Sequence, residues 1–303
     1  MARVTQHYQI SKPVPFVDVR VEQDNRLFLE PSAIRAAAAA GDPYAISADR
    51  NLTSFFDHVL DSARCNDLGR RSDLLQHLHE PNETRLGMTR VGVAGHGLGN
   101  ELTAELWSSI RDNPACQEAV LVRRLEDLAP YVAGVGPDLI SDLSTRITFG
   151  ILAEFTASMI AVYPQLGIDV SRQREYTWDS AQGMWVSIDI TLPVAAGKRL
   201  LLVPTNWVWP RQLITAPSFY QVQALGRIQD ALTTPAPTPG QRPMAPTKES
   251  LRQAHPDVRR TNIDQALDAV DDGINLTARH TEHVQNRFEE IKMSPDEINR
   301  LIS

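Results

Sequence analysis

The segment from Thr233 to Thr247 limits the fold of this chain more than any other. It reads TTPAPTPGQRPMAPT, with five prolines and one glycine. Each proline fixes φ and lacks a backbone N–H, so the segment cannot continue a helix or a central strand. We therefore predict three parts: a main domain over residues 1–232, a proline-rich linker over 233–247 and a charged helical tail over 248–303.

Ahead of the linker, strand patterns and helix patterns follow one another. Residues 16–21 (FVDVRV) alternate in polarity and a second apolar run covers residues 27–29, so we predict a β-hairpin there. Ser32 is the expected N-cap of the helix that follows. Apolar residues three or four apart predict further helices, near the following segments: 32–40, 51–65, 71–79, 100–111 and 219–232.

The longest helical pattern runs from Pro137 to about Tyr163. Its apolar residues recur every three or four positions, and Pro137 suits a first turn because the N–H it lacks would have no partner there. Gly150 lies inside the pattern, and we expect it to divide or bend the helix.

After Gly167 the pattern changes to strands. Residues 174–178, 184–192 and 199–203 are separated by short turns, which predicts a small antiparallel sheet. The sequence therefore predicts a mixed α/β fold of the α+β class: a helix-rich body with a small antiparallel sheet, a proline-rich linker and a helical tail.

Composition and net charge indicate which classes of molecule the chain is suited to bind. Hydrophobic residues make up 42% of the chain and charged residues 22%, as in ordinary globular proteins, and the net charge is −7. This charge disfavours broad attraction to nucleic acid but leaves room for a local basic site. The arginine pairs 70–71, 123–124 and 259–260 are either such a site or solvated surface.

Sequence features also predict the compartment. The N-terminus has no apolar signal region, and no stretch reaches the roughly 20 apolar residues that span a bilayer. Cys65 and Cys116 are far apart and form no CxxC motif, which is typical of a reducing compartment. We therefore predict a cytoplasmic protein that does not contact a membrane.

Two acidic residues at a predicted helix start are candidate metal ligands. Asp138 and Asp142 are four residues apart and project from one helical face, so they could hold Mg²⁺ with water and phosphate oxygens completing the shell. Glu83, in the polar loop 80–87, could supply a third carboxylate. The alternatives are helix capping for the two aspartates and a surface connection for the loop.

A glycine-rich run could contact a nucleotide. Gly95, Gly97 and Gly99 precede a predicted helix, where free backbone N–H groups bind phosphate, with His96 as a neighbouring polar group. No lysine follows as in a P-loop, and the alternative is a flexible structural loop.

Four tryptophans fall on or beside the predicted sheet: Trp178, Trp185, Trp207 and Trp209. They could stack on nucleobases, but we favour a place in the core because buried tryptophan is common in sheets. The histidines lack the spacing of a zinc site, and no GxSxG elbow is present.

The order of several motifs resembles a known protein family. The motifs are PFVDVRVEQDNRLFLEP, EPNETRLG, GVAGHGLGNE, GVGPDLISDL and KRLLLVP, and they span about residues 14–210. This order resembles uncharacterised bacterial proteins associated with phage-defence and mobile-element gene neighbourhoods. In such relatives a lysine after the Leu-Val-Pro strand would complete a carboxylate-and-lysine nuclease site. This chain has Thr205 at that position and Lys198 at the other end of the strand.

The sequence thus leaves three functional hypotheses. The first is a defence-associated, Mg²⁺-dependent nuclease or phosphodiesterase, with Asp138 and Asp142 as metal ligands, Glu83 as an auxiliary carboxylate and Lys198 as an electrostatic stabiliser. The second is a non-catalytic sensor or assembly subunit that docks on a protein partner, or on a second copy, through its tail. The third is nucleotide binding at the glycine-rich run.

The tail itself has only a thin apolar stripe, which runs from Ile263 to Leu276. So little apolar surface cannot offset a backbone ordering cost of about 1–2 kcal/mol per residue. We therefore expect the tail to dock on this chain, on a second copy or on another protein.

Overall fold

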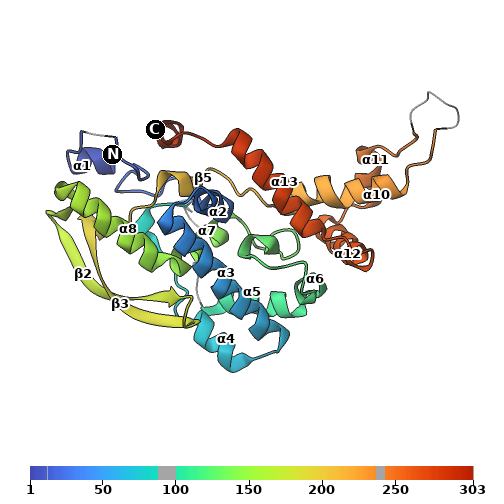
Figure 1. Ribbon diagram of the computed structural model, residues 1–303, viewed down its shortest axis with the longest axis horizontal. Coiled ribbons are helices and arrows are strands. Elements are labelled where there is room, and N and C mark those ends of the chain that lie inside the picture. Colours follow the sequence, from blue (N-terminus) through green and yellow to red (C-terminus); the bar gives the residue numbers. More distant parts are fainter. Residues whose placement is uncertain (12, 88–99, 237–242, 303) are drawn as a thin grey trace.

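The computed structural model describes residues 1–11, 13–87, 100–236 and 243–302 (Figure 1). Helices make up 56% and strands, in small antiparallel sheets, 13%, which confirms the predicted α+β class. The α-helices of the body are α1 (Val4–His7), α2 (Pro31–Ala39), α3 (Pro43–Arg64), α4 (Leu68–Leu75), α5 (Asn100–Asp112), α6 (Pro114–Gln117), α7 (Pro137–Ile147), α8 (Phe149–Val162), α9 (Ala216–Phe219) and α10 (Leu225–Ala231).

Shorter elements and the tail complete the fold. The short helical turns are η1 (Asn82–Thr84), η2 (Leu125–Leu128), η3 (Pro164–Gly167), η4 (Thr205–Trp207) and the π-turn η5 (Tyr220–Ala224). The tail helices are α11 (Lys248–Ala254), α12 (Val258–Asp271), α13 (Leu276–Ile291) and α14 (Pro295–Leu301). The strands are β1 (Phe28–Leu29), β2 (Val170–Asp179), β3 (Met184–Ala195), β4 (Lys198–Arg199) and β5 (Val208–Trp209).

The predicted sheet is present as the antiparallel order β2-β3-β4. Strands β2 and β3 form a long hairpin, with Trp178 opposite Trp185, and α8 packs against both strands (Figure 1). The third strand is shorter than predicted, because the chain leaves β3 after Leu200, whose N–H still donates to the Pro193 carbonyl at 2.8 Å. Beyond that point the backbone N–H of Leu201 donates to the carbonyl of Glu83, 2.9 Å away.

The N-terminal hairpin that the alternating pattern predicted does not form. Instead, both runs pair with a distant segment: the Val17 N–H donates to the Val203 carbonyl, and β1 pairs with β5. Alternation shows that a segment suits a strand, but it does not specify the partner.

Local capping sets where the first helices begin. The N-cap of α2 is Glu30 rather than Ser32, since the Glu30 carboxylate accepts from the Ser32 N–H at 3.2 Å. Helix α3 starts eight residues earlier than predicted, because Asp42 caps it and Pro43 fits its first turn. Its apolar stripe, which includes Phe55, is buried as expected.

The long predicted helix is two helices, α7 and α8, with an angle of 71° between them. The break falls at Thr148, two residues before Gly150. Gly150 serves a different purpose: its N–H donates to Thr177 Oγ1, and a Cβ there would lie 2.5 Å from that oxygen. The missing side chain therefore lets α8 approach β2.

Among the described residues, no single helix is long and apolar enough to cross a membrane. The bent pair α7 and α8 passes that test only when its two helices are taken together.

The tail packs on the body of the same chain. Ala266, Leu276 and Phe288 belong to the same buried core as the body helices. Tyr131 and Thr277 share a hydrogen bond of 2.6 Å, and Asn262 donates to the carbonyl of Pro130. Of the docking sites that the sequence left open for the tail, this chain itself is the one observed.

Helices α10 and α11 project from the body with a small core of their own (Figure 1). At the base of the proline-rich segment, Thr234 and Met244 form an antiparallel bridge. The two described ends of the linker are therefore held side by side.

Candidate functional site

Four of the five motifs that carry the family resemblance, all but the glycine-rich run, meet at the loop 82–87. The Asn25 N–H donates to the Arg85 carbonyl at 2.7 Å, and the Gly87 N–H donates to the Asn25 carbonyl at 3.1 Å. The strand motif joins the same loop through Leu201 and Glu83, as described above. We call this loop and its contacts on residues 25, 138, 146, 175 and 199 the motif junction.

Arg85 holds the loop in place from inside. Its backbone adopts the left-handed conformation, with φ of 57°, which costs a non-glycine residue about 1–2 kcal/mol. The buried guanidinium donates to the carbonyls of Val21, Asn82 and Arg199. The carbonyls of Val21 and Arg199 come from distant segments, so these hydrogen bonds offset the strain and fix the position of the loop.

A charged cluster lies against the loop. Arg199 forms an ion pair with Glu83 and another, of 3.0 Å, with Glu175 on β2. Arg146 on α7 lies 3.9 Å from the second oxygen of Glu175. The side chains of Glu83, Glu175 and Arg199 are 11–29% exposed, so solvent reaches the outer part of the cluster.

Arg146 is the inner cation of this cluster and is only 1% exposed. Its Nε donates to the His77 carbonyl at 2.7 Å, and its guanidinium lies over the rings of Phe149 and Trp185. Among the described residues its Nη1 has no hydrogen-bond acceptor. Burial lowers the pKa of this arginine, and Glu175 opposes that shift.

Two histidines flank the cluster. Burial and the nearby Arg146 lower the pKa of both His77 and His79, which favours their neutral forms at pH 7. The His77 ring stacks on Tyr176, with 3.8 Å between centroids and 17° between planes. Tyr176 is 42% exposed, so this aromatic stack faces solvent. Arg174, two residues earlier on β2, is exposed as well and pairs with Asp189 of β3.

Glu83, the expected auxiliary carboxylate, lies in this region, and its cation partner is Arg199. Lys198 is exposed, whereas its neighbour Arg199 reaches Glu83. Successive residues of a strand point to opposite faces, so a shift of one position exchanges the exposed residue for the inward one. Arg146, His77 and Glu175 were not predicted, because their segments are far apart in the sequence.

The predicted metal ligands lie at the edge of the junction. Asp138 is in the first turn of α7, and a Cβ at Gly87 would lie 3.6 Å from its Oδ1. Asp142 is one turn further, and both aspartates have interaction partners. Over the described parts of the chain, no group of three or more His, Cys, Asp or Glu residues could hold a metal ion.

The glycine-rich run falls outside the described residues, which include neither Gly95, Gly97 and Gly99 nor His96. The tryptophans are described, and Trp178, Trp185, Trp207 and Trp209 are all buried. Their predicted place in the core is confirmed, and the exposed aromatic beside the cluster is Tyr176 instead.

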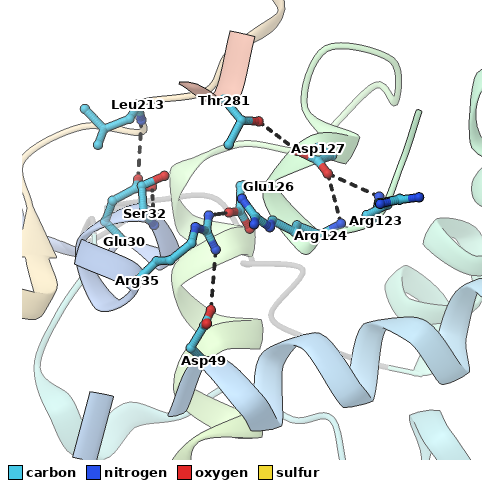
Figure 2. A network of polar contacts seen from close by, with 10 residues as sticks. All are labelled: Glu30, Ser32, Arg35, Asp49, Arg123, Arg124, Glu126, Asp127, Leu213 and Thr281. Carbon is cyan, nitrogen blue, oxygen red and sulfur yellow. Dashed lines mark hydrogen bonds and ion pairs between the residues drawn. The ribbon is translucent and has the colours of Figure 1, made fainter. Parts of the chain in front are cut away.

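A second polar network has its acidic centre inside the protein and its edges, at Asp49 and Arg123, near solvent (Figure 2). Arg35 forms an ion pair with Glu126 and lies 3.5 Å from Asp49, while Glu30 accepts from the N–H groups of Ser32 and Leu213. Asp127 caps the turn η2. Burial, followed by the charge of Glu126, raises the pKa of Glu30 to about 7, and the same two causes raise that of Asp127.

This network serves the fold rather than a ligand. Glu30, Glu126 and Asp127 are only 1–3% exposed, and the carboxylates of Glu30 and Asp127 cap backbone N–H groups. Thr281 of α13 lies 3.5 Å from Asp127, so the network also fastens the tail (Figure 2). The motif junction is therefore the better candidate site.

Comparison with known proteins identifies one family. A family model described as a domain of unknown function, DUF8370, matches residues 8–215 and so includes every motif quoted above. No curated protein and no solved structure matches the chain. The match covers more than half of the residues, and the chain belongs to the DUF8370 family.

Proposed function

We propose that this chain is a nucleic-acid-binding sensor subunit of a bacterial phage-defence system, and that single-stranded nucleic acid binds at the motif junction. The observation that supports it best is the charged cluster with an exposed aromatic stack beside it. The defence setting rests on the resemblance of the motif order.

The guanidinium groups of the cluster favour an anion. Arg146 and Arg199 approach the carboxylate of Glu175, Arg199 also pairs with Glu83, and the flanking histidines tend to be neutral. In this partly desolvated place, charges interact more strongly than in water. Guanidinium groups also match the geometry of a phosphate.

Strand β2, next to the cluster, has exposed side chains that could contact the bases of a bound nucleic acid. Arg172, Arg174 and Tyr176 occupy every second position of β2 and are all exposed, on the face of the strand opposite to Glu175. Arg174 also pairs with Asp189 of β3 at 3.3 Å. A base could stack on the Tyr176 ring while phosphates follow the arginines, as in single-strand-binding proteins. Because the whole chain has a net charge of −7, binding would stay confined to this face.

Anisotropy of fluorescein-labelled single-stranded RNA and DNA tests the proposal. Tyr176→Ala should weaken binding about tenfold, because loss of one stacked base is worth about 1–3 kcal/mol. Arg172→Gln should reduce the slope of the logarithm of the binding constant against the logarithm of the salt concentration by about one, because one phosphate contact is lost. Both side chains are exposed, so neither change should affect folding. Arg260→Gln, an exposed arginine of α12, is the matched control.

Two results would contradict the proposal. One is a failure of both strands to bind in low salt. The other is unchanged binding in Tyr176→Ala and Arg172→Gln alike.

Mg²⁺-dependent cleavage is a second candidate, favoured by the approach of Gly87, in the loop that holds Glu83, to Asp138. The same labelled strands, incubated with Mg²⁺ or with EDTA, report cleavage directly. If the hypothesis holds, Asp138→Asn with Asp142→Asn abolishes Mg²⁺-dependent cleavage and leaves binding intact. Cleavage that persists in this double variant would exclude the two aspartates as metal ligands.

A further inference from the structure

Strand β2 forms one edge of its sheet. The strand order is β2-β3-β4, so β2 pairs with β3 on one side and with no described strand on the other (Figure 1). The strand is 10 residues long, which gives an edge of about 34 Å at roughly 3.4 Å per residue. An exposed edge of this length is a template for pairing with a strand of another chain.

The hydrogen bonds show which residues of β2 face this edge. The Val194 N–H donates to the Asp169 carbonyl at 3.0 Å, so odd-numbered residues of β2 bond to β3 and even-numbered residues point their backbone groups the other way. The Trp178 carbonyl agrees, since it accepts from the Asn51 side chain at 2.8 Å. Among the described residues, no segment pairs with the outward backbone groups of residues 172, 174 and 176.

The opposite side of the hairpin is less suited to pairing. At one end β4 occupies it, through Ala195, and Pro193 lacks a backbone N–H. At the other end α4 packs against β3, and the Trp185 indole N–H donates to the Leu74 carbonyl at 2.9 Å. Only the β2 side offers a long, uninterrupted edge within the described sheet.

We propose that two copies of this chain pair through β2, antiparallel and about a two-fold axis, with Arg174 opposite the same residue of the second copy. The side chains complement themselves in this register. Arg172 lies opposite Tyr176 of the second copy, so a guanidinium meets an aromatic ring, and Gln173 lies opposite Glu175, so an amide meets a carboxylate. The exposed Arg174 is held by Asp189 of its own copy at 3.3 Å, which reduces the repulsion between the two arginines.

Neighbouring registers bring like charges together. A shift of two residues in one direction places Arg172 opposite Arg174 twice, and a shift in the other direction places Glu175 opposite itself. Like charges directly opposite each other destabilise a strand pair. The edge therefore fits a second copy of itself in one register.

The pairing has a consequence for the surface that carries the exposed side chains of β2. A two-fold axis perpendicular to the sheet keeps the same face of both copies on one side. Arg172 and Tyr176 of both copies then line one continuous sheet, and the face proposed above for nucleic acid doubles. This consequence rests on the proposed function, whereas the pairing rests on the strand edge alone.

Sedimentation velocity of the full-length protein, without nucleic acid, tests the pairing. We expect a reversible change from monomer to dimer over about 1–100 µM, as for a small interface. Arg174→Pro removes an N–H that faces the edge, where proline is tolerated, so it should fold by circular dichroism but dimerise at least tenfold more weakly. Ser187→Pro is the matched control, because its N–H faces the opposite side of the hairpin. It should dimerise as the native chain does.

A cysteine variant tests the register and does not require the proline variant to fold. In a Cys65→Ser background, which removes the exposed native thiol, Arg174→Cys should form a disulfide-linked dimer under mild oxidation. Directly opposed residues have Cα atoms about 5.5 Å apart, within the roughly 4.4–6.8 Å that a disulfide spans. Ser187→Cys, also exposed but on β3, should not cross-link.

Three results would overturn the inference. The native protein could remain a monomer up to about 100 µM, where a small specific interface should associate. Arg174→Pro could fold and dimerise as the native chain does. Ser187→Cys could cross-link as readily as Arg174→Cys, which would place the contact elsewhere.

Discussion

At the scale of single residues, buried charge is concentrated in two places with different balances. In the motif junction, three arginines lie beside the carboxylates of Glu83, Glu175 and Asp138, and solvent reaches the outer members. In the internal network of Figure 2, carboxylates surround the single inner cation Arg35. The first arrangement suits an anionic ligand, whereas the second leaves acids that resist ionisation.

The internal network predicts an unusual dependence of stability on pH. Glu30 has a pKa of about 7 in the folded chain against an ordinary 4.5. Between these values the folded state binds more protons than the unfolded state, so stability falls as the pH rises. We expect a loss of up to roughly 3 kcal/mol in the free energy of unfolding between pH 4.5 and 7.5.

Urea denaturation across this pH range measures the effect. Glu30→Gln keeps an acceptor for the backbone N–H groups but cannot ionise, so its stability should vary less with pH than that of the native chain. Glu289→Gln, an exposed control, should follow the native curve. An equally steep loss of stability in Glu30→Gln would show that Glu30 is not responsible.

At the scale of elements, the distance between a helix and the sheet decides whether a glycine in the helix can be replaced by a larger residue. Gly150 and Gly226 both lie inside helices, and by helix propensity alone both are unfavourable. Their surroundings differ: a Cβ at Gly150 would meet the buried Thr177 at 2.5 Å, while a Cβ at Gly226 would meet no atom within 4 Å.

Alanine at these two positions should therefore have opposite effects. Gly150→Ala should destabilise the protein by about 1–3 kcal/mol, because Thr177 is β-branched and buried and cannot give way easily. Gly226→Ala should stabilise it by about 0.4–1 kcal/mol through the entropy of the unfolded chain. Chemical denaturation of both variants checks this, and stabilisation by Gly150→Ala would contradict the close approach of α8 to β2.

At the scale of the whole molecule, the tail completes the body rather than standing apart. Leu276, Phe288 and Ile298 are buried in the same core as the body residues, and Asn299 accepts a hydrogen bond from the backbone of Asp18 near the other terminus. In Figure 1 the tail helices lie along the side of the molecule that holds α2.

Cleavage of the linker should therefore leave the protein assembled, whereas deletion of the tail should not. A protease site introduced between Thr234 and Met244 should give two fragments that still elute together and unfold in one transition. Deletion of residues 233–303 should instead expose buried apolar surface and cause aggregation or a lost transition. Size-exclusion chromatography and circular dichroism compare the two. A stable monomer after the deletion would show that the body folds without the tail.

Part of the candidate site could be read from the sequence. The polar loop with Glu83 and the acidic turn with Asp138 were both recognised, because runs of polar residues beside glycine and proline are local signals. Arg146, His77 and Glu175 were not, since nothing in their own segments distinguishes them from surface or helix residues. Only the packing of α7 against β2 brings these side chains together.

The sequence by itself determined most of the helices and the β2-β3 hairpin, because the period of apolar residues and the capping residues act over a few neighbours. It did not determine residues 16–21 and 200–203, which were expected as strands and form none. It also determined the α+β class. The tertiary structure decided which strands pair, that Arg199 rather than Lys198 reaches Glu83, and that the tail packs on its own body. These contacts join residues that are far apart in the chain, and their geometry depends on the packing of the whole core.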